Sequence, residues 1–418
     1  MELSIVLPTL NEAKNVKIIL PRIRKVMKNI LELRDFEILI IDSGSKDDIR
    51  QVALENKVRL IEVNRGYGIA VKAGIKASRG RYVIMMDADL SHNPYIIPNL
   101  YSHREEAEIL IASRFIKTGY NNTHLSRRVL SKLLNWTYRM VLDFPVRDMS
   151  SGYRLYHKKI FQDMKLRGLN YVVLQEILTQ TYAQGYTIKE IPFHYHPRKY
   201  GSTKSRLIKF GVEYVGSLYQ FWRQRNSIES ADYDERAFHS RVWFQRYWQR
   251  KRYEIICDYC KDFDSILDVG CGSSQIMDGL PQAIGCDVKM NKLRYKRSPF
   301  RKLARASVYA LPFPDDYFEC VIFSQVIEHL PKDPVILDEV VRVAKKDSVL
   351  VIGTPDYATW WTLIEKIYGF FQPSGYADEH ITHYTRKSLI AEMEKRDCEY
   401  IDHRYVLGAE LIVRFRKK

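Results

Sequence analysis

Short apolar runs that alternate with helix-like segments occur in two separate series in this chain of 418 residues. Runs of this length, bounded by turn residues, are typical of buried strands. The first series covers 3–8, 36–41, 58–63 and 81–86, and the second covers 265–269, 283–286, 320–324 and 349–353. After the first run, apolar residues recur at helical spacing from Val16 to Ile30, with Asn11 as the expected N-cap. Strands that alternate with helices predict parallel sheets, so we expect two α/β domains.

The length and the charge distribution indicate where the domains divide. A chain of 418 residues exceeds the size of one ordinary hydrophobic core. The segment 198–252 holds 13 Lys and Arg against five Asp and Glu, so half of the net charge of +16 falls in about an eighth of the chain. We therefore expect a first domain at 1–222, a basic and aromatic linker at 223–250, and a second domain at 251–418.

Composition and the chain's termini disfavour secreted and membrane-spanning classes of protein. The six cysteines are too few for a disulfide framework and indicate reduced thiols in the cytoplasm. The N-terminus lacks a basic segment followed by an apolar run, and no uncharged apolar stretch of about 18 residues occurs, so we expect neither a signal peptide nor a spanning helix. The excess positive charge favours a polyanionic partner such as nucleic acid, an anionic membrane or a phosphorylated substrate.

Acidic residues follow the strands expected in the first domain. Asp42 ends the second run, and Asp87 and Asp89 follow the fourth. In an open α/β sheet, ligands bind outside the carboxyl ends of the strands, so these carboxylates should face one crevice. Two acids separated by one residue suit a hard divalent cation, Mg²⁺ or Mn²⁺, which could bridge a diphosphate.

These acids belong to an ordered set of motifs: Pro-Thr-Leu-Asn-Glu at 8–12, Asp-Ser-Gly-Ser at 42–45, Asn-Arg-Gly-Tyr-Gly at 64–68, Asp-Ala-Asp at 87–89, Ala-Ser-Arg-Phe at 112–115 and Asp-Met-Ser-Ser-Gly-Tyr-Arg at 148–154. Residues 1 to about 210 thereby resemble the inverting family 2 glycosyltransferases that use polyprenyl phosphates, which implies a nucleotide-sugar-binding fold of type A. The resemblance implies that Pro8, Glu12 and Asp42 hold the nucleoside, that Asp87 and Asp89 hold the metal and diphosphate, and that Asp148 and Arg154 lie at the substrate site.

The same resemblance assigns the phosphates of donor and acceptor to the basic residues Arg114, Arg127, Arg198 and Lys204. A lipid phosphate is already ionised at pH 7, so such a site needs cations that bring two anions together more than it needs a general base. Guanidinium groups match phosphate oxygens in geometry. The implied donor is a nucleotide sugar of the GDP-mannose or UDP-glucose type.

Two amphipathic segments follow this domain. Apolar residues from Leu207 to Trp222, with basic residues near both ends, predict either a helix in a membrane interface or a helix packed between domains. We expect peripheral association with the cytoplasmic face of the membrane. The run 241–252 interleaves aromatic residues with arginines, which could bind single-stranded nucleic acid, but no recognised motif accompanies it and we expect a helix instead.

In the second domain, a strand runs into a glycine turn at Asp268-Val269-Gly270-Cys271-Gly272. Gln275 stands where a dinucleotide fingerprint needs a third glycine, which points away from NAD. With Asp287, 311–318 and 326–330, this turn resembles the class I methyltransferases that use S-adenosylmethionine, with a Rossmann-like fold. The resemblance implies that Gly270 and Gly272 approach the methionine portion and that Asp287 approaches the ribose. Asp268, Ser307 and Leu311 complete the expected cofactor site.

A hydroxyl acceptor would benefit from a base, and His329, His380 and His383 are the candidates. Cys257 and Cys260 have C-x-x-C spacing but no second pair nearby, so we interpret them as one face of a helix.

The expected protein is a glycosyltransferase and methyltransferase in one chain. Two alternatives stay open: an inactive first domain that docks the methyltransferase on lipid or glycan, suggested by Ser43 where many relatives have a second acid, and a nucleic-acid methyltransferase, suggested by the basic segment.

Overall fold

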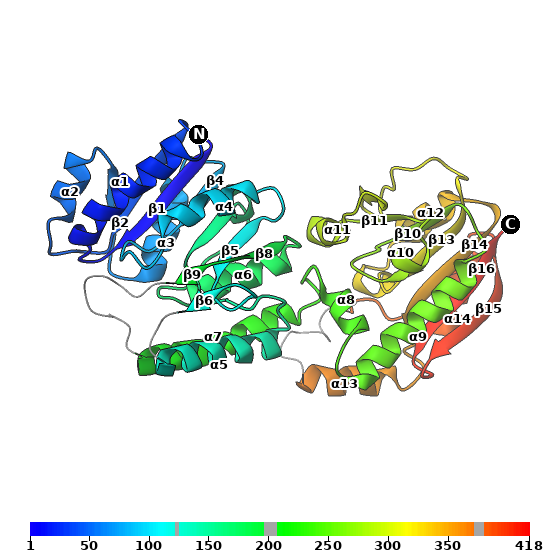
Figure 1. Ribbon diagram of the computed structural model, residues 1–418. Coiled ribbons are helices and arrows are strands. Elements are labelled where there is room, and N and C mark those ends of the chain that lie inside the picture. Colours follow the sequence, from blue (N-terminus) through cyan, green and yellow to red (C-terminus); the bar gives the residue numbers. More distant parts are fainter. Residues whose placement is uncertain (122–124, 196–206, 372–379) are drawn as a thin grey trace. The chain divides into compact units, whose positions relative to one another are not determined.

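The computed structural model describes residues 1–121, 125–195, 207–371 and 380–418, and the chain forms two compact units (Figure 1). Unit 1 comprises 1–182 and 186–225, and unit 2 comprises 183–185 and 226–418. The chain passes from unit 1 to unit 2 at 225–226, three residues beyond the expected end of the first domain. Half of the segment expected as a linker lies in two helices of unit 2, α8 (Tyr233–Phe238) and α9 (Trp243–Cys260).

Unit 1 is built on a seven-stranded mixed sheet with the order β3-β2-β1-β4-β7-β5-β8. Its strands are β1 (Leu3–Thr9), β2 (Phe36–Asp42), β3 (Arg59–Glu62), β4 (Tyr82–Met85), β5 (Ile109–Ser113), β7 (Arg154–His157) and β8 (Ile188–Pro192). The first four are the expected strands. β1 is parallel to both β2 and β4, whereas β7 is antiparallel to β4 and β5. The short strands β6 (Tyr120–Asn121) and β9 (His194–Tyr195) form a separate pair.

Helices cover both faces of this sheet. Those of unit 1 are α1 (Ala13–Asn29), α2 (Ile49–Glu55), α3 (Tyr67–Ala77), α4 (Ile97–Ser102), α5 (Leu125–Leu142), α6 (Val173–Ala183) and α7 (Leu207–Arg225). α1, α2 and α4 pack on one face through side chains such as Ile19 and Ile97, and α3, α5, α6 and α7 contribute to the core on the other face. Buried apolar side chains on both faces account for strands that read as continuous apolar runs.

The start of α1 differs from the expectation. The N-cap is Glu12 and not Asn11, whose φ of 54° places it in the left-handed region. The Glu12 side chain makes no capping bond, and Asp47 Oδ2 instead accepts from the Ala13 N–H at 2.7 Å. An aspartate from the loop after β2 thus performs the role of the cap, which ties the β1 and β2 loops together.

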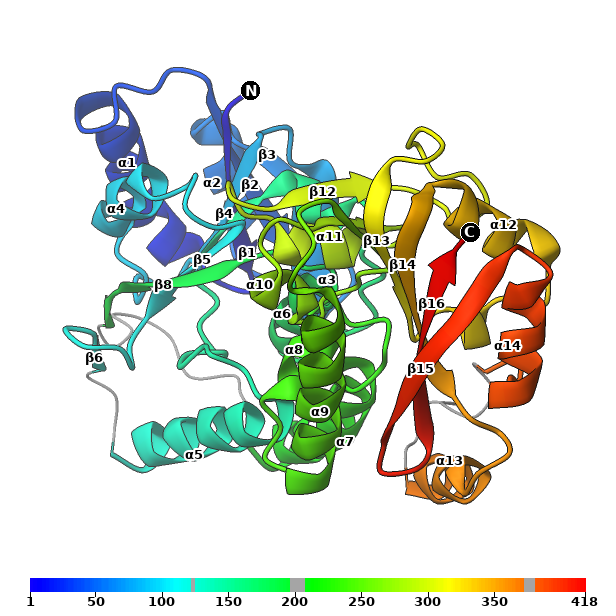
Figure 2. The same ribbon diagram turned by 90° about the vertical axis from the view of Figure 1, so that its right-hand side faces the viewer.

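Unit 2 has its own seven-stranded sheet with the order β12-β11-β10-β13-β14-β16-β15. The strands are β10 (Ile266–Val269), β11 (Ile284–Asp287), β12 (Lys302–Arg305), β13 (Phe318–Ser324), β14 (Ala344–Pro355), β15 (Cys398–Val406) and β16 (Glu410–Lys417). The five from β10 to β14 are parallel, and β16 runs antiparallel to β14 and β15 (Figure 2). Each strand expected in this half overlaps one of them.

The remaining helices of unit 2 are α10 (Ile276–Gly279), α11 (Met290–Lys296), α12 (Pro334–Arg342), α13 (Trp361–Phe371) and α14 (Arg386–Glu394). α12 and α14 pack in one core cluster, and α9, α10, α11 and α13 pack in another. α9 belongs to this unit because Trp248, Ile255 and Ile256 are buried in that second cluster. Part of the basic and aromatic run is therefore core.

Two further expectations concerned the helix that carries Cys257 and Cys260 and the lack of a membrane-spanning helix. Cys257 and Cys260 both lie on α9, and all six cysteines are free thiols. Cys260 is buried with its Sγ 3.3 Å from Cys320 Sγ. Among the helices that the structure describes, none combines the length and the apolar character that crossing a membrane requires.

Candidate functional site

The first candidate site lies where the strand order of unit 1 changes direction. From β1 the chain adds β2 and β3 on one side and then β4 on the other, and the carboxyl ends of strands at such a point open a crevice for ligands. A cavity of about 380 Å³ lies there. It is lined by four of the residues expected at the nucleotide-sugar site, namely Pro8, Glu12, Asp87 and Asp89.

The backbone around the two aspartates is held in place by the residues that follow them. Asp89 is buried, and its Oδ1 accepts from the Ser91 N–H at 3.0 Å and from the Ser91 hydroxyl. His92 Nδ1 accepts from the Asp87 N–H at 2.8 Å, and the His92 ring stacks on Tyr153. Burial lowers the pKa of His92, which favours the neutral ring that this bond requires. Two carboxylates on one cavity wall offer the oxygen ligands that Mg²⁺ and Mn²⁺ prefer.

Asp42 lies beside this cavity and does not line it. Its carboxylate accepts from the Ser45 N–H at 3.0 Å and from the Ser45 hydroxyl, so it shapes the loop after β2. Ser43 occupies the cavity wall at this point.

A loop near the start of α6, which sequence reasoning missed, completes the cavity wall. Asn170 and Tyr171 both line it. The ring of Tyr171 stacks on Tyr67 with a centroid distance of 4.4 Å and an interplanar angle of 16°. Asn170 Nδ2 donates to both carboxylate oxygens of Glu213 in α7, at 2.9 and 3.0 Å. No motif in the sequence marks this loop, because it reaches the site only through the packing of α6 and α7.

Of the basic residues expected to bind phosphates, only Arg114 has a side chain within the described part of the structure. Arg114 donates from Nε and Nη2 to the two oxygens of Asp148, both at 2.8 Å, and Nη2 also reaches Ser150 Oγ at 2.8 Å. Burial opposes the charge of Arg114, but Asp148 outweighs burial and raises the pKa of the guanidinium. Arg65 lines the cavity and was not among the expected site residues, although it belongs to one of the motifs. The side chain of Arg127, and the whole of Arg198 and Lys204, lie outside the described residues.

Two expected substrate contacts are corrected by burial. Asp148 is completely buried, so it holds Arg114 and has no surface for a substrate. Arg154 is also completely buried, and its guanidinium donates to the backbone carbonyls of Ser151, Leu174 and Met149 at 2.8, 2.8 and 2.7 Å. The side chains of Asp148 and Arg154 therefore support the frame of the site in this structure.

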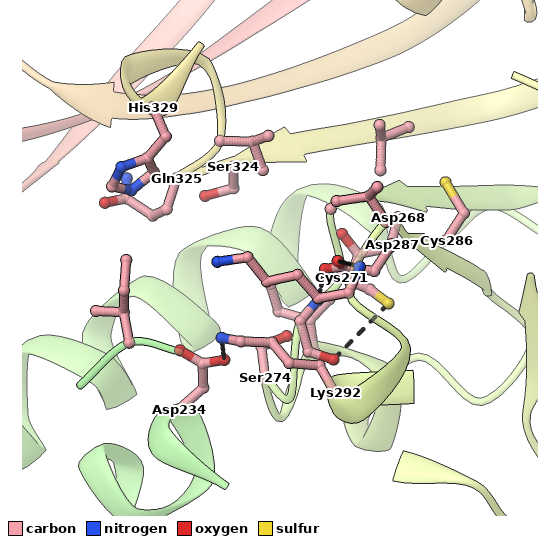
Figure 3. A pocket seen from close by; sticks show the side chains of 18 of the residues that line it. Asp234, Asp268, Cys271, Ser274, Cys286, Asp287, Lys292, Ser324, Gln325 and His329 are labelled. Carbon is pink, nitrogen blue, oxygen red and sulfur yellow. Dashed lines mark hydrogen bonds and ion pairs between the residues drawn. The ribbon is translucent and has the colours of Figure 1, made fainter. Parts of the chain in front are cut away.

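The second candidate site lies at the corresponding point of unit 2, where β11 and β13 flank β10. A cavity of about 650 Å³ opens there, and Figure 3 shows part of its lining. Gly270 and Gly272 line it with φ values of 74° and 55°. A Cβ at Gly270 would lie 2.3 Å from a methyl group of Val326, and a Cβ at Gly272 would lie 2.9 Å from Asp234 Oδ2. The turn therefore requires glycine at both positions, as expected.

Two aspartates, Asp268 and Asp287, lie at the glycine turn (Figure 3), and they differ in their hydrogen bonding. Asp287 accepts from the Gly272 N–H at 2.9 Å and from the Lys289 N–H at 2.7 Å, so it fixes the turn. Asp268 is buried, and its Oδ2 has no hydrogen-bond partner among the described residues. Burial, together with the charge of Asp287, raises the pKa of Asp268 to about 7. This buried carboxyl, which lines the cavity, suits a cationic ligand such as a sulfonium.

Asp234 in α8 reaches the same turn, and sequence reasoning assigned it to the linker. Its Oδ2 accepts from the Ser273 N–H at 3.0 Å and from the Ser273 hydroxyl at 2.8 Å. It also accepts from Lys292 Nζ at 2.9 Å (Figure 3). Burial opposes its charge, but Lys292 and Ser273 lower the pKa of Asp234 to about 2. The only hint in the sequence was its acidic character within a basic segment.

Of the other residues expected at the cofactor and acceptor sites, some line the cavity and others do not. Ser307 lines the cavity. Leu311 is not among the lining residues; it is buried, and its N–H donates to Glu339 at 2.8 Å. His329 and His380 line the cavity, whereas His383 is exposed and stacks on Tyr357 at 4.0 Å. His329 and Gln325 lie on a part of the cavity away from Asp287 (Figure 3).

Comparison with family models identifies both halves. The model for glycosyl transferase family 2 matches residues 4–165, and the model for a methyltransferase domain matches residues 267–352. Each unit of the chain therefore matches the model of a transferase family. The first unit carries a family 2 glycosyltransferase domain, and the second unit carries a methyltransferase domain.

Two curated relatives each match about half of the chain. The dolichol-phosphate mannosyltransferase of Pyrococcus furiosus is 28% identical over 240 residues, which are 55% of this chain and 66% of the relative. The undecaprenyl-phosphate 4-deoxy-4-formamido-L-arabinose transferase of Yersinia enterocolitica is 28% identical over 216 residues, 50% of this chain and 64% of the relative. The chain thus spans just under two thirds of the length of these relatives.

Solved structures resemble each half more distantly. The glucosyl-3-phosphoglycerate synthase of Mycobacterium tuberculosis with Mn²⁺, uridine-diphosphate-glucose and phosphoglyceric acid is 19% identical, with a TM-score of 0.43 over 54% of this chain and 79% of that protein. A SAM-dependent methyltransferase of Thermotoga maritima, described as a possible histamine N-methyltransferase, is 17% identical, with a TM-score of 0.38 over 44% of this chain and 94% of that protein.

Proposed function

We propose that this chain is a bifunctional enzyme of lipid-linked glycan synthesis. Its first domain transfers a sugar from a nucleotide diphosphate to a polyprenyl phosphate, and its second domain methylates a sugar or glycolipid of the same pathway. The observation that carries the first activity is the crevice in which Pro8, Glu12, Asp87 and Asp89 meet. The relatives support a polyprenyl phosphate as the acceptor, since the name of each includes one.

Asp87 and Asp89 would hold Mg²⁺ or Mn²⁺, which supplies positive charge to the leaving diphosphate when it is bound. The phosphate oxygen of the lipid forms a bond to the anomeric carbon while the bond from that carbon to the diphosphate breaks, which inverts the configuration. Arg65 lies on the cavity wall where it can contact phosphate oxygens, and the stacked rings of Tyr67 and Tyr171 offer a flat surface beside it. Electrostatics and positioning would then provide most of the catalysis.

A lipid acceptor requires that the first domain approach a membrane, and α5 and α7 offer a surface for this. The two helices pack against each other and are well apart from β1 (Figures 1 and 2). On α5, one stripe at a spacing of three and four residues is exposed: Val129, Leu133, Trp136 and Met140, with 57% of the Trp136 surface accessible. Val215 and Tyr219 of α7 are also exposed. We propose that this surface lies in the interface of the cytoplasmic leaflet, with Lys132 and Arg139 toward anionic headgroups.

The second domain would use S-adenosylmethionine. The cavity fits it because the two glycines bring the backbone to the cavity and the buried Asp268 carboxyl lacks a hydrogen-bond partner at Oδ2 within the described chain. Gly270 and Gly272 would contact the methionine portion and Asp287 the ribose side. The fusion of this domain to a glycosyltransferase is the reason to expect a sugar or glycolipid as the methyl acceptor.

Sugar transfer is tested with the full-length protein, polyprenyl phosphate, Mg²⁺ or Mn²⁺ and radiolabelled nucleotide sugars of the GDP-mannose and UDP-glucose types. The expected product is a labelled lipid that Asp89→Ala reduces by at least about 100-fold. Asp163→Ala is the matched control, because Asp163 is an exposed acid outside the cavity. Full product formation by Asp89→Ala would overturn the metal assignment. Lipid binding without transfer or donor hydrolysis would favour a docking domain.

A further inference from the structure

A buried carboxylate in the methyltransferase unit has no role in the sites described above. Glu328 lies in the short 3₁₀ helix η3 (Ile327–His329) and is completely buried. Neither of its carboxylate oxygens has a hydrogen-bond partner within the described residues. A buried carboxylate without hydrogen bonds is costly unless a positive charge lies beside it. Burial raises the pKa of the Glu328 carboxyl and outweighs the effect of Arg252, which favours the charged form.

Two histidines stand next to this carboxylate. The backbone carbonyl of Glu328 accepts from the N–H groups of Ile381 and Thr382, at 2.9 and 3.1 Å, which brings the segment after His380 against η3. The rings of His329 and His380 are 4.8 Å apart between centroids. One ligand atom from each of Glu328, His329 and His380 lies within 4.8 Å of the other two. The two histidines also line the large cavity of unit 2.

Hydrogen bonds at Nδ1 fix the orientation of the His380 ring. Its Nδ1 lies 2.9 Å from Glu365 Oε1 and 3.0 Å from the Tyr357 hydroxyl. An ionised carboxylate only accepts hydrogen bonds, so Nδ1 carries the proton in its bond to Glu365, and Nε2 carries the lone pair. Histidines that bind metals are typically held in this way by a carboxylate at the nitrogen that does not bind the metal.

We propose that Glu328, His329 and His380 bind a divalent transition-metal ion at the wall of the methyltransferase cavity. Two imidazoles and one carboxylate suit Zn²⁺, Mn²⁺, Fe²⁺ or Co²⁺, whereas the carboxylate pair of the first domain suits Mg²⁺ or Mn²⁺. Ligand atoms around one ion lie about 3.3 Å apart when the bonds are about 2.1 Å long. Side-chain rotations that close the present separations by about 1.5 Å would complete the site.

Three protein ligands leave coordination positions open, and the lining histidines direct these positions into the cavity. An oxygen donor of the methyl acceptor, such as a sugar hydroxyl, fits there, because a bound cation lowers the pKa of a hydroxyl. This second step rests on the proposed methyl transfer, whereas the binding of the metal does not. His329 and His380 are then metal ligands and not the general bases that their sequence suggested.

The test uses the full chain with Asp87→Ala and Asp89→Ala, which removes the other candidate metal site. Titration with Co²⁺ should give visible d–d absorbance with about one ion bound per chain, confirmed by elemental analysis after dialysis. Glu328→Gln and His380→Ala should each weaken Co²⁺ binding by at least about 100-fold. Glu365→Gln, which changes the partner of Nδ1, should weaken it by about 10-fold to 100-fold.

His239→Ala is the matched control, because His239 is exposed in the same unit and lines neither cavity. It should bind Co²⁺ like the parent protein. Thermal unfolding of each variant establishes that it is folded, and His329→Ala provides a second ligand variant should one of the others be unstable. The proposal is overturned if the parent protein binds no Co²⁺, or if folded ligand variants bind it as tightly as the parent. Co²⁺ binding by the Asp87→Ala, Asp89→Ala protein, together with a lack of methyl transfer by the unaltered protein, would leave the metal site intact and refute the proposed function.

Discussion

The ionisation of Asp268 should control the affinity of the second domain for S-adenosylmethionine. The pKa of this buried carboxyl is raised to about 7, mainly by burial and further by the charge of Asp287. About one tenth of the molecules therefore carry a charged Asp268 at pH 6, and about nine tenths do so at pH 8. If the cationic ligand binds the charged form, its Kd should fall about tenfold between these pH values, which corresponds to about 1.4 kcal/mol.

Isothermal titration calorimetry at pH 6, 7 and 8 measures this effect, with Asp268→Asn as the comparison. The variant keeps the shape of the side chain and removes its titration, so any pH dependence that remains belongs to the ligand or to other groups. We expect the parent protein to show about tenfold more pH dependence than the variant. Equal pH dependence in the two proteins would refute the assignment of the linked proton to Asp268.

The same carboxyl should affect the stability of the ligand-free protein. It ionises near pH 3.9 in the unfolded chain and near pH 7 in the folded chain. Between these pH values the folded state holds a proton on Asp268 that the unfolded state has lost. The contribution of Asp268 to the free energy of unfolding is therefore largest below about pH 4 and falls as the pH rises to about 7. The shift of about three units sets an upper limit of about 4 kcal/mol. Asp268→Asn should remove this part of the pH dependence in thermal unfolding.

Three further substitutions test other parts of the structure. Asp234→Asn should weaken S-adenosylmethionine binding by about tenfold in calorimetry, because the substitution leaves the buried Lys292 without its carboxylate partner. In the parent protein, the stability that the Asp234 carboxylate provides should be lost as the pH falls from about 4 to about 2. Arg154→Met should lower the free energy of unfolding of unit 1 by about 3 kcal/mol in urea denaturation, because three buried carbonyls lose their donor. The pair Leu133→Ala and Trp136→Ala should reduce co-sedimentation with anionic vesicles by about tenfold, whereas Leu54→Ala, at an exposed residue of α2, should not.

The sequence was sufficient to predict four strands of each sheet and the main residues of each crevice. Local patterns carry this information: apolar runs give the strands, and acids or glycines that directly follow a strand must lie at its carboxyl end. Asp87 and Asp89 therefore meet in one cavity, and Gly270 and Gly272 meet in the other. The sequence did not predict the antiparallel strands β7 and β16, which make both sheets mixed rather than parallel.

The residues that sequence reasoning missed or misplaced depend on packing between distant segments. Tyr171 reaches the first cavity through the position of α6, and Asp234 reaches the glycine turn because α8 packs beside it. Asp148 and Arg154 lie within a site motif, but a motif does not tell whether a side chain faces the ligand or the interior. Burial and hydrogen-bond partners decide this, and here they place both residues in the interior.

The central claim is that both domains act on one lipid-linked glycan. The most direct measurement is a single incubation of the full-length protein with polyprenyl phosphate, ³H-labelled nucleotide sugar and ¹⁴C-methyl-labelled S-adenosylmethionine, followed by extraction of the lipid. We expect both labels in one lipid product, with Asp89→Ala removing the sugar label and the methyl label together. A lipid fraction that carries neither label with any common nucleotide sugar, from protein that binds S-adenosylmethionine, would contradict the account.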